Sequence, residues 1–262
     1  MKKRLLYLIS IAFLMAFSAC NDKKESDPVI TDPVKDSSTV NLDFRLVYGN
    51  GDFELNKVYD YSLGYQLKFE KLKLYISNVR FIKADNSVVN GPEIIFVEDT
   101  SSTFSKVTFK IPIGEYSKME YSMGVPPDLN GANNPDFDAA LYNNDHPLSL
   151  NTSMYWTWNA GYRFILIDGK VNQTPMADDD FETLLSIHTG KDYAFRNVEA
   201  LHEFIAAKDQ AIDIEMSIDI AGFLDNPADV IDLAVDNQSH GENAGLANRV
   251  SDNAMKSVVI KQ

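Results

Sequence analysis

The chain has 262 residues, of which 45% are hydrophobic and 24% are charged, and this balance excludes a disordered, collagen-like or coiled-coil protein. Lys and Arg number 24 against 38 Asp and Glu, which gives a formal net charge of -14. Because nucleic-acid binding draws its affinity from clustered basic residues, this acidity argues against DNA or RNA as a partner.

The first nineteen residues have the features of an export signal. Basic residues at positions 2–4 precede an apolar run over residues 5–17, which is too short to span a bilayer comfortably. The end of this segment, at Ala19-Cys20, resembles the lipobox of a bacterial lipoprotein. Residues 1–19 are therefore predicted to be a lipoprotein signal peptide, and an acylated Cys20 would be the only anchor to the outer membrane. An ordinary secretory signal with an incidental cysteine is the alternative.

Residues 20–39 are polar, contain proline and offer almost nothing to bury, so they are expected to form a flexible tether. Cys20 is the only cysteine of the chain. Once it carries a lipid, no thiol is left for a disulfide, a zinc site or a nucleophile. Residues 40–262 are expected to form one domain that is stabilised by its core, located at the periplasmic or the outer surface of the cell envelope.

Alternating hydrophobic residues predict that this domain is all-β. Residues 40–48 place apolar side chains on one face and polar ones on the other, which is typical of a half-buried strand. Similar runs are separated by turn clusters of Gly, Asn, Asp and Pro and do not alternate with long amphipathic helices. An antiparallel β-sandwich with long irregular loops and short helices is therefore predicted. The other runs lie at residues 67–82, 94–98, 107–111, 162–167 and 212–220.

Two long stretches lack a strand pattern and are the expected location of a functional site. Residues 126–150 contain one short helix candidate at 137–142, and residues 225–249 contain His240 in a Ser-His-Gly context. Irregular segments of this length in a compact domain are usually functional or disordered. The chain has no nucleotide-binding, zincin or serine-hydrolase signature. The acidic run at residues 178–180 is interpreted as a solvated turn, because three consecutive side chains cannot all face one cation in a regular element.

The most informative segment is residues 154–162, which contains both tryptophans of the chain. In an extended conformation Met154, Trp156 and Trp158 share one face. The simplest interpretation is a packed core in which sulfur-aromatic contacts add stability. Gly161 would then supply a backbone conformation that other residues avoid.

Several further motifs accompany this segment in a characteristic order. They are Tyr75-Ile76-Ser77-Asn78-Val79-Arg80, Ile113-Gly114-Glu115-Tyr116, Met123-Gly124-Val125-Pro126, His146-Pro147-Leu148 and His188-Thr189-Gly190. Together with Trp-x-Trp-x-x-Gly-Tyr at residues 156–162, they resemble the MbnP family of copper-binding, methanobactin-associated proteins. The resemblance extends over residues 40–262.

The resemblance implies a non-enzymatic envelope protein that acquires, stores or delivers copper. It also implies that an MbnH-type di-haem peroxidase oxidises Trp156 or Trp158 to kynurenine. Copper ligands would fall among His146, His188 and His240.

Cu(I) favours imidazole, thioether and thiolate ligands. With the thiolate excluded, the chain offers histidine and methionine, so Met154 joins the candidate ligands. His202 is expected on a solvated face.

Two other functions remain open at this stage. The tryptophans and nearby tyrosines would also suit a stacking platform for a glycan or peptide ligand. Alternatively, the same motif would fix a corner of the core in a purely structural envelope domain.

Overall fold

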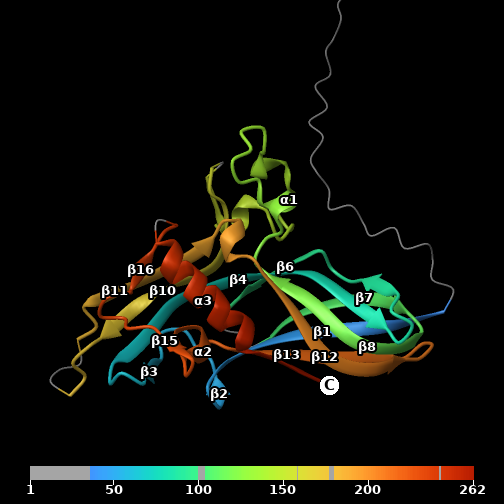
Figure 1. The fold of residues 1–262 in the computed structure, drawn as a ribbon, viewed down its shortest axis with the longest axis horizontal. Helices are drawn as coiled ribbons and strands as arrows, with labels where there is room; N and C mark the ends of the chain where they lie inside the picture. The colour runs from blue at the N-terminus through green and yellow to red at the C-terminus, as the bar shows by residue number, and fades with distance from the viewer. Residues whose placement is uncertain (1–35, 100–103, 158, 177–179, 242) are drawn as a thin grey trace, which may run out of the picture.

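The protein is all-β, as predicted, with a few short helices (Figure 1). The computed structural model describes residues 36–99, 104–157, 159–176, 180–241 and 243–262. The predicted signal peptide, Cys20 and the first part of the predicted tether lie outside the described residues.

The larger of the two main sheets has ten strands, in the order β12-β8-β4-β10-β11-β16, and four shorter strands pair with β4 or β10. All pairs are antiparallel except β11 with β16, which are parallel. The strands are β3 (Val58–Asp60), β4 (Gln66–Lys83), β5 (Val88–Asn90), β6 (Ile94–Glu98), β8 (Gly114–Met123), β9 (Tyr155–Thr157), β10 (Gly161–Asn172), β11 (Thr183–Gly190), β12 (Arg196–Ala206) and β16 (Gln238–Ser239).

The smaller sheet has five strands, namely β1 (Ser37–Tyr48), β2 (Gly51–Asp52), β7 (Phe104–Pro112), β13 (Ala211–Asp219) and β17 (Val258–Lys261). Strand β1 pairs with β7 in an antiparallel sense and with β13 in a parallel sense. The pairing of β1 with β13 is therefore an exception to the antiparallel pairing that the sequence predicted. The reason is that β1 and β13 are far apart in sequence, so no hairpin forces them to run in opposite directions.

Strand β1 shows why the alternation in the sequence was informative. Val40, Leu42, Phe44 and Leu46 are all buried, while their neighbours are partly exposed. The strand begins at Ser37, earlier than the first residue of the predicted run, because its backbone continues to pair with β7. Polar side chains at this end hid the extension from hydrophobic patterning.

Two hydrophobic clusters stabilise the domain. The first combines inward-facing side chains of both sheets, such as Phe44 of β1, Phe69 of β4 and Met216 of β13. The second is smaller and surrounds Tyr75 and Tyr162, whose rings meet edge to face with centroids 6.0 Å apart. This second cluster holds the segment between β8 and β10 against the larger sheet.

The longest helix is α3 (Ala244–Lys256), which lies against β11 and β12 (Figure 1). An ion pair joins the helix to β12, because Nε of Arg196 on β12 lies 2.6 Å from Oδ1 of Asp252 in α3. Residues 244–249 were expected to be irregular, and that prediction is wrong. Small and polar residues in α3 conceal its helical periodicity, although Asn243 accepts a hydrogen bond from the Leu246 amide as a regular N-cap.

The remaining helical elements are one turn long. The helix candidate at 137–142 is a 3-10 turn, Ala139–Leu141. The others are α1 (Pro127–Asn130), α2 (Ala221–Leu224) and the 3-10 turns Leu150–Thr152 and Asp192–Ala194, while β14 (Asp225–Asn226) and β15 (Asp229–Val230) form a separate small hairpin. Within the described ranges, none of the helices is long and apolar enough to cross a bilayer.

The turn between β9 and β10 depends on Gly161, as predicted. Its φ is +72°, and a Cβ atom there would lie 2.2 Å from Asn130 Oδ1. The same Asn130 oxygen accepts a hydrogen bond of 2.8 Å from the Tyr162 amide. Gly161 therefore lets the hairpin close against α1 and fixes where β9 presents its side chains.

Candidate metal centre

Strand register brings two histidines together at one edge of the larger sheet. Asp168 on β10 lies opposite Ser186 on β11, and His188 follows two residues later on the same face of β11. Strand β16 runs parallel to β11 with Gln238 beside Ser186, so His240 continues past the end of β16 toward His188.

The two imidazoles lie close together and share polar neighbours. The ring centroids of His188 and His240 are 4.8 Å apart, at an interplanar angle of 78°. Nε2 of His240 lies 3.0 Å from Ser186 Oγ, and Nε2 of His188 lies 2.9 Å from Asp168 Oδ1. His188 is only 8% exposed, whereas His240 is exposed, so the pair reaches from the interior to the surface.

The carboxylate of Asp168 determines which nitrogen of His188 has a free lone pair. An ionised carboxylate only accepts hydrogen bonds, so Nε2 of His188 carries the proton and donates it to Asp168. Nδ1 of neutral His188 then has a lone pair, and this atom is buried with no hydrogen-bond partner among the described residues. A buried imidazole nitrogen without a hydrogen-bond partner is a candidate metal ligand when the other ring nitrogen is held by a carboxylate.

The surroundings keep Asp168 ionised. Burial alone would raise its pKa, but hydrogen bonds from His188 and Ser186 outweigh burial and lower the pKa below its ordinary value. The Ser186 hydroxyl donates to Asp168 Oδ1 over 2.9 Å, and Lys71 Nζ lies 3.9 Å from Oδ2. Asp168 therefore orients both Ser186 and His188.

Trp156 on β9 borders the histidine pair. Its ring centroid lies 6.1 Å from that of His188 and 6.4 Å from that of His240, with the rings nearly perpendicular in both cases. Gly241 has a φ of +95°, and a Cβ there would lie 3.4 Å from Cη2 and Cζ3 of Trp156. The backbone after His240 thus packs closely beside the indole.

Arg163 covers the indole of Trp156. Its guanidinium carbon lies 4.9 Å from the ring centroid, which is cation-π distance. Nη1 donates to the Ser153 carbonyl over 3.1 Å. Burial lowers the pKa of Arg163, and the charge of Asp168 opposes that shift.

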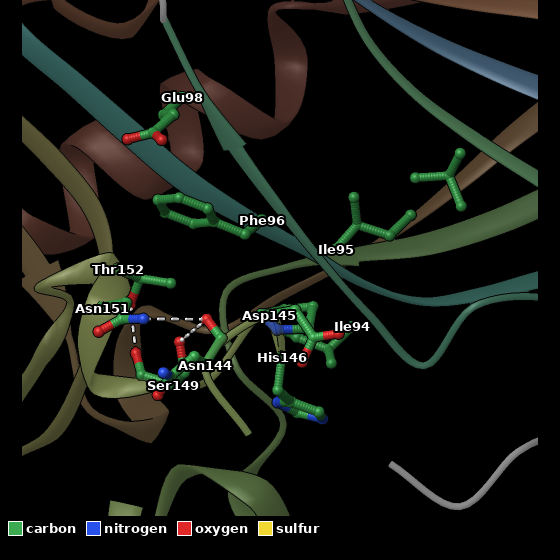
Figure 2. Close-up of a pocket in the computed structure, with 12 residues that line it drawn as sticks. Ile94, Ile95, Phe96, Glu98, Asn144, Asp145, His146, Ser149, Asn151 and Thr152 are labelled. Atoms are coloured by element: carbon green, nitrogen blue, oxygen red, sulfur yellow. Dashed lines mark hydrogen bonds between the residues drawn. The ribbon is translucent and has the colours of Figure 1, made fainter. Parts of the chain in front are cut away.

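His146 does not join this pair and lies in a different group of contacts. Its ring stacks on Tyr142 with centroids 4.3 Å apart, and its Nδ1 accepts a hydrogen bond of 3.0 Å from the Leu148 amide. Together with Phe96 and Asn151, it lines a cavity of about 450 Å³ beside β6 (Figure 2). The lone pair of His146 Nδ1 is therefore used by a hydrogen bond within its own loop.

The other predicted site residues have separate environments. Met154 is fully buried in the second hydrophobic cluster. Trp158 lies outside the described residues, as do residues 178 and 179 of the acidic run. His202 was expected on a solvated face, but it is only 9% exposed, with its ring 5.7 Å from that of Phe204. That expectation is wrong because a bulge in β12 turns the residue inward.

Sequence reasoning missed Asp168, Ser186 and Arg163. A usable signal was the polar alternation Ser186-x-His188 in an apolar strand, but the opposing Asp168 needs the register of β10 and β11. Across the part of the chain that the structure describes, no three His, Cys, Asp or Glu side chains form a preformed metal cluster. The candidate site accordingly consists of a pair of imidazoles and a carboxylate that orients one of them.

Comparison with known proteins agrees with the motifs. The profile of the MbnP family matches residues 37–243, which is most of the chain. Among solved structures, MbnP from Methylosinus trichosporium is similar, with 14% sequence identity and a TM-score of 0.45, over 74% of this chain and 79% of that one. A search of curated proteins gives no match.

Proposed function

Because the chain belongs to the MbnP family of methanobactin-associated proteins, we propose that it binds copper between His188 and His240. The observation that carries this proposal is the convergence of the two imidazoles, 4.8 Å apart, beside Trp156. A binding function also agrees with the absence of common catalytic signatures from the sequence. The protein would take up, hold or pass on copper without catalysing a reaction itself.

The donor set fits copper in its soft, reduced state. Cu(I) accepts imidazole ligands at low coordination number, so two histidines are a sufficient minimum. Asp168 holds the tautomer of His188 that leaves Nδ1 available, which is the usual arrangement around metal-binding histidines. His240 is exposed and offers the route by which an ion reaches the buried partner.

Of the described residues, Trp156 is the tryptophan to which we assign oxidation to kynurenine by an MbnH-type di-haem peroxidase. Its indole borders both imidazoles and is half-buried, so an oxidant docked at the surface comes close to it. Ring opening inserts two oxygen atoms and then releases one carbon and one oxygen, and it leaves an aryl amine and a ketone next to the metal. Both groups are polar and suited to contact with the ion.

The sequence supports a location in the cell envelope. The signal-like residues 1–19 and the lipobox-like Cys20 favour a lipid anchor in the outer membrane, with the domain on the periplasmic or the outer side. The stacking-platform alternative has less support, since Arg163 covers Trp156 and Tyr155 packs against Tyr162 with centroids 5.1 Å apart.

The test is a copper titration with matched histidine variants. Competition with a Cu(I) chelator should give one ion per protein, and His188→Ala and His240→Ala should each weaken binding at least about a hundredfold, as expected for loss of one of two ligands. His146→Ala is the control and should bind like the parent. Equal losses in all three variants, or none in any, would contradict the proposal.

The second measurement is the mass of protein from its own cell envelope. We expect fragment-ion masses to place the modification on Trp156 and not on Trp158, two residues later in the same peptide. Native protein that carries unmodified tryptophan would remove the peroxidase from the proposal while leaving the copper site intact.

A further inference from the structure

Arg163 is held over Trp156 by two hydrogen bonds to the residues that precede β9. Its backbone amide donates to the Met154 carbonyl over 2.9 Å, and its Nη1 donates to the Ser153 carbonyl over 3.1 Å. Both acceptors immediately precede β9, so they are linked covalently to Trp156. The guanidinium carbon therefore stays near 4.9 Å from the indole centroid.

The positive charge of Arg163 is poorly compensated. Its Nε is buried and has no hydrogen-bond partner among the described residues. The acidic group that acts on it is Asp168, whose carboxylate already accepts hydrogen bonds from His188 and Ser186. An arginine keeps its proton at neutral pH even when burial works against it. The indole thus faces a permanent cation in a partly desolvated environment.

This arrangement has a direct consequence for redox chemistry. A cation over an indole is attracted by the electrons of the ring, and the attraction grows when the cation is desolvated. Removal of one electron from the ring places a second positive charge next to the first, at a site that is only partly open to water. The guanidinium therefore stabilises the reduced indole and destabilises its radical cation.

We propose that Arg163 protects Trp156 against one-electron oxidation by raising the free energy of its radical cation. Each one-electron oxidant then removes an electron from the indole more slowly than it would without the guanidinium, so adventitious oxidation is slowed. Arg163 is a positioning residue that acts on the indole through its charge. The inference bears on the proposed oxidation of Trp156, but it requires no copper and no particular partner.

The experiment uses metal-free protein in which Trp158→Phe makes Trp156 the only tryptophan. A photogenerated ruthenium(III) complex takes one electron from the indole and becomes ruthenium(II), and the indole radical cation then releases its N–H proton to water. Transient absorption of the tryptophan radical gives the rate. Arg163→Met should be oxidised about threefold to tenfold faster than the parent, the factor that corresponds to loss of one ordinary cation-π contact.

Arg163→Lys is the matched control, because it retains the charge and should remain close to the parent. Equal acceleration in the Lys and Met variants would show that steric cover protects the ring, and it would overturn the proposal. An unchanged rate in Arg163→Met would do the same. Far-ultraviolet circular dichroism and thermal unfolding establish that each variant is folded.

Arg163→Gln is the second uncharged variant, in case the Met variant fails to fold, because it can still donate to Ser153. If neither folds, the midpoint potential of Trp156 in the Trp158→Phe protein decides. It should lie above that of N-acetyltryptophanamide, and an equal or lower potential overturns the proposal. Since no metal is present, failure here leaves the copper titration unaffected, and failure of that titration leaves this measurement valid.

Discussion

The environments of His188 and His146 differ in what their ring nitrogens contact. His188 has one nitrogen held by Asp168, and its other nitrogen is buried with no hydrogen-bond partner in the part of the chain that the structure describes. His146 uses Nδ1 to accept the Leu148 amide and its ring face to stack on Tyr142. The first arrangement leaves a lone pair for a ligand, whereas the second uses it to hold a loop. Whether a histidine can bind a metal therefore depends more on which of its ring nitrogens already have hydrogen-bond partners than on its location in a loop.

Met154→Ala should have the largest effect, a loss of stability that involves the region around His146 and leaves the region around His188 unchanged. Met154 is fully buried in the cluster that holds the His146 loop, so truncation should cost about 2–5 kcal/mol of unfolding free energy. Chemical denaturation measures the loss. Copper affinity of the folded fraction should be unchanged, and a loss similar to that of His188→Ala would return Met154 to the ligand set.

The next effect concerns the orientation of His188. Asp168→Asn lets an amide donate to Nε2, which favours the tautomer with the proton on Nδ1, so copper affinity should fall about tenfold to a hundredfold. Chelator competition measures it. Asp145→Asn, next to His146, is the matched control. If the two substitutions weaken binding equally, general charge rather than tautomer control explains the effect.

A smaller effect is expected from Tyr162→Phe. The Tyr162 hydroxyl donates to the buried Leu148 carbonyl over 2.6 Å, and its loss should cost about 1 kcal/mol. Urea denaturation should show this shift. Tyr65→Phe, which removes an exposed bond to Asp232, should change stability very little. A change in copper affinity with Tyr162→Phe would argue that the two regions are coupled.

The smallest effect should be a pH dependence. Burial lowers the pKa of His146, with Asp145 opposing, so the unfolded chain takes up the proton more readily than the folded one. The free energy of unfolding should therefore decrease as pH falls below about 6.5, the ordinary histidine value.

The variant for this test is His146→Asn, which can keep an acceptor for the Leu148 amide but cannot titrate. It should flatten the dependence of thermal stability on pH between neutrality and mild acid. Burial also lowers the pKa of His202, so His202→Asn provides an independent comparison with the same expected sign. An unchanged slope in both variants would assign the pH dependence to other groups.

The fold was predictable where periodicity was strong. Strand β6 matches its predicted range, and the buried residues of β1 are those of the alternating pattern. Helix α3 and strands β8, β11 and β12 were not identified, because their polar or small residues blur the period. Parallel pairing of β1 with β13 is a tertiary property that no local pattern contains.

The candidate site was predictable only in part, for a similar reason. Motif resemblance singled out His188, His240 and Trp156 among its candidates, and the structure brings these three side chains together. It gave His146 the same weight, because a sequence does not show which nitrogen is already bonded. Asp168 and Arg163 act through cross-strand contacts, and these follow from register alone.

The position of β1 between β7 and β13 has a consequence for how the chain acquires its structure. The Ser38 hydroxyl donates a hydrogen bond to the Gln210 carbonyl, 172 residues later in the sequence. Strand β1 can therefore pair with β13 only after most of the chain has been synthesised. Pairing between strands so far apart in sequence predicts slow folding, and the edge of β1 stays unpaired until β13 is in place. Chains that end before β13 should therefore aggregate through this edge.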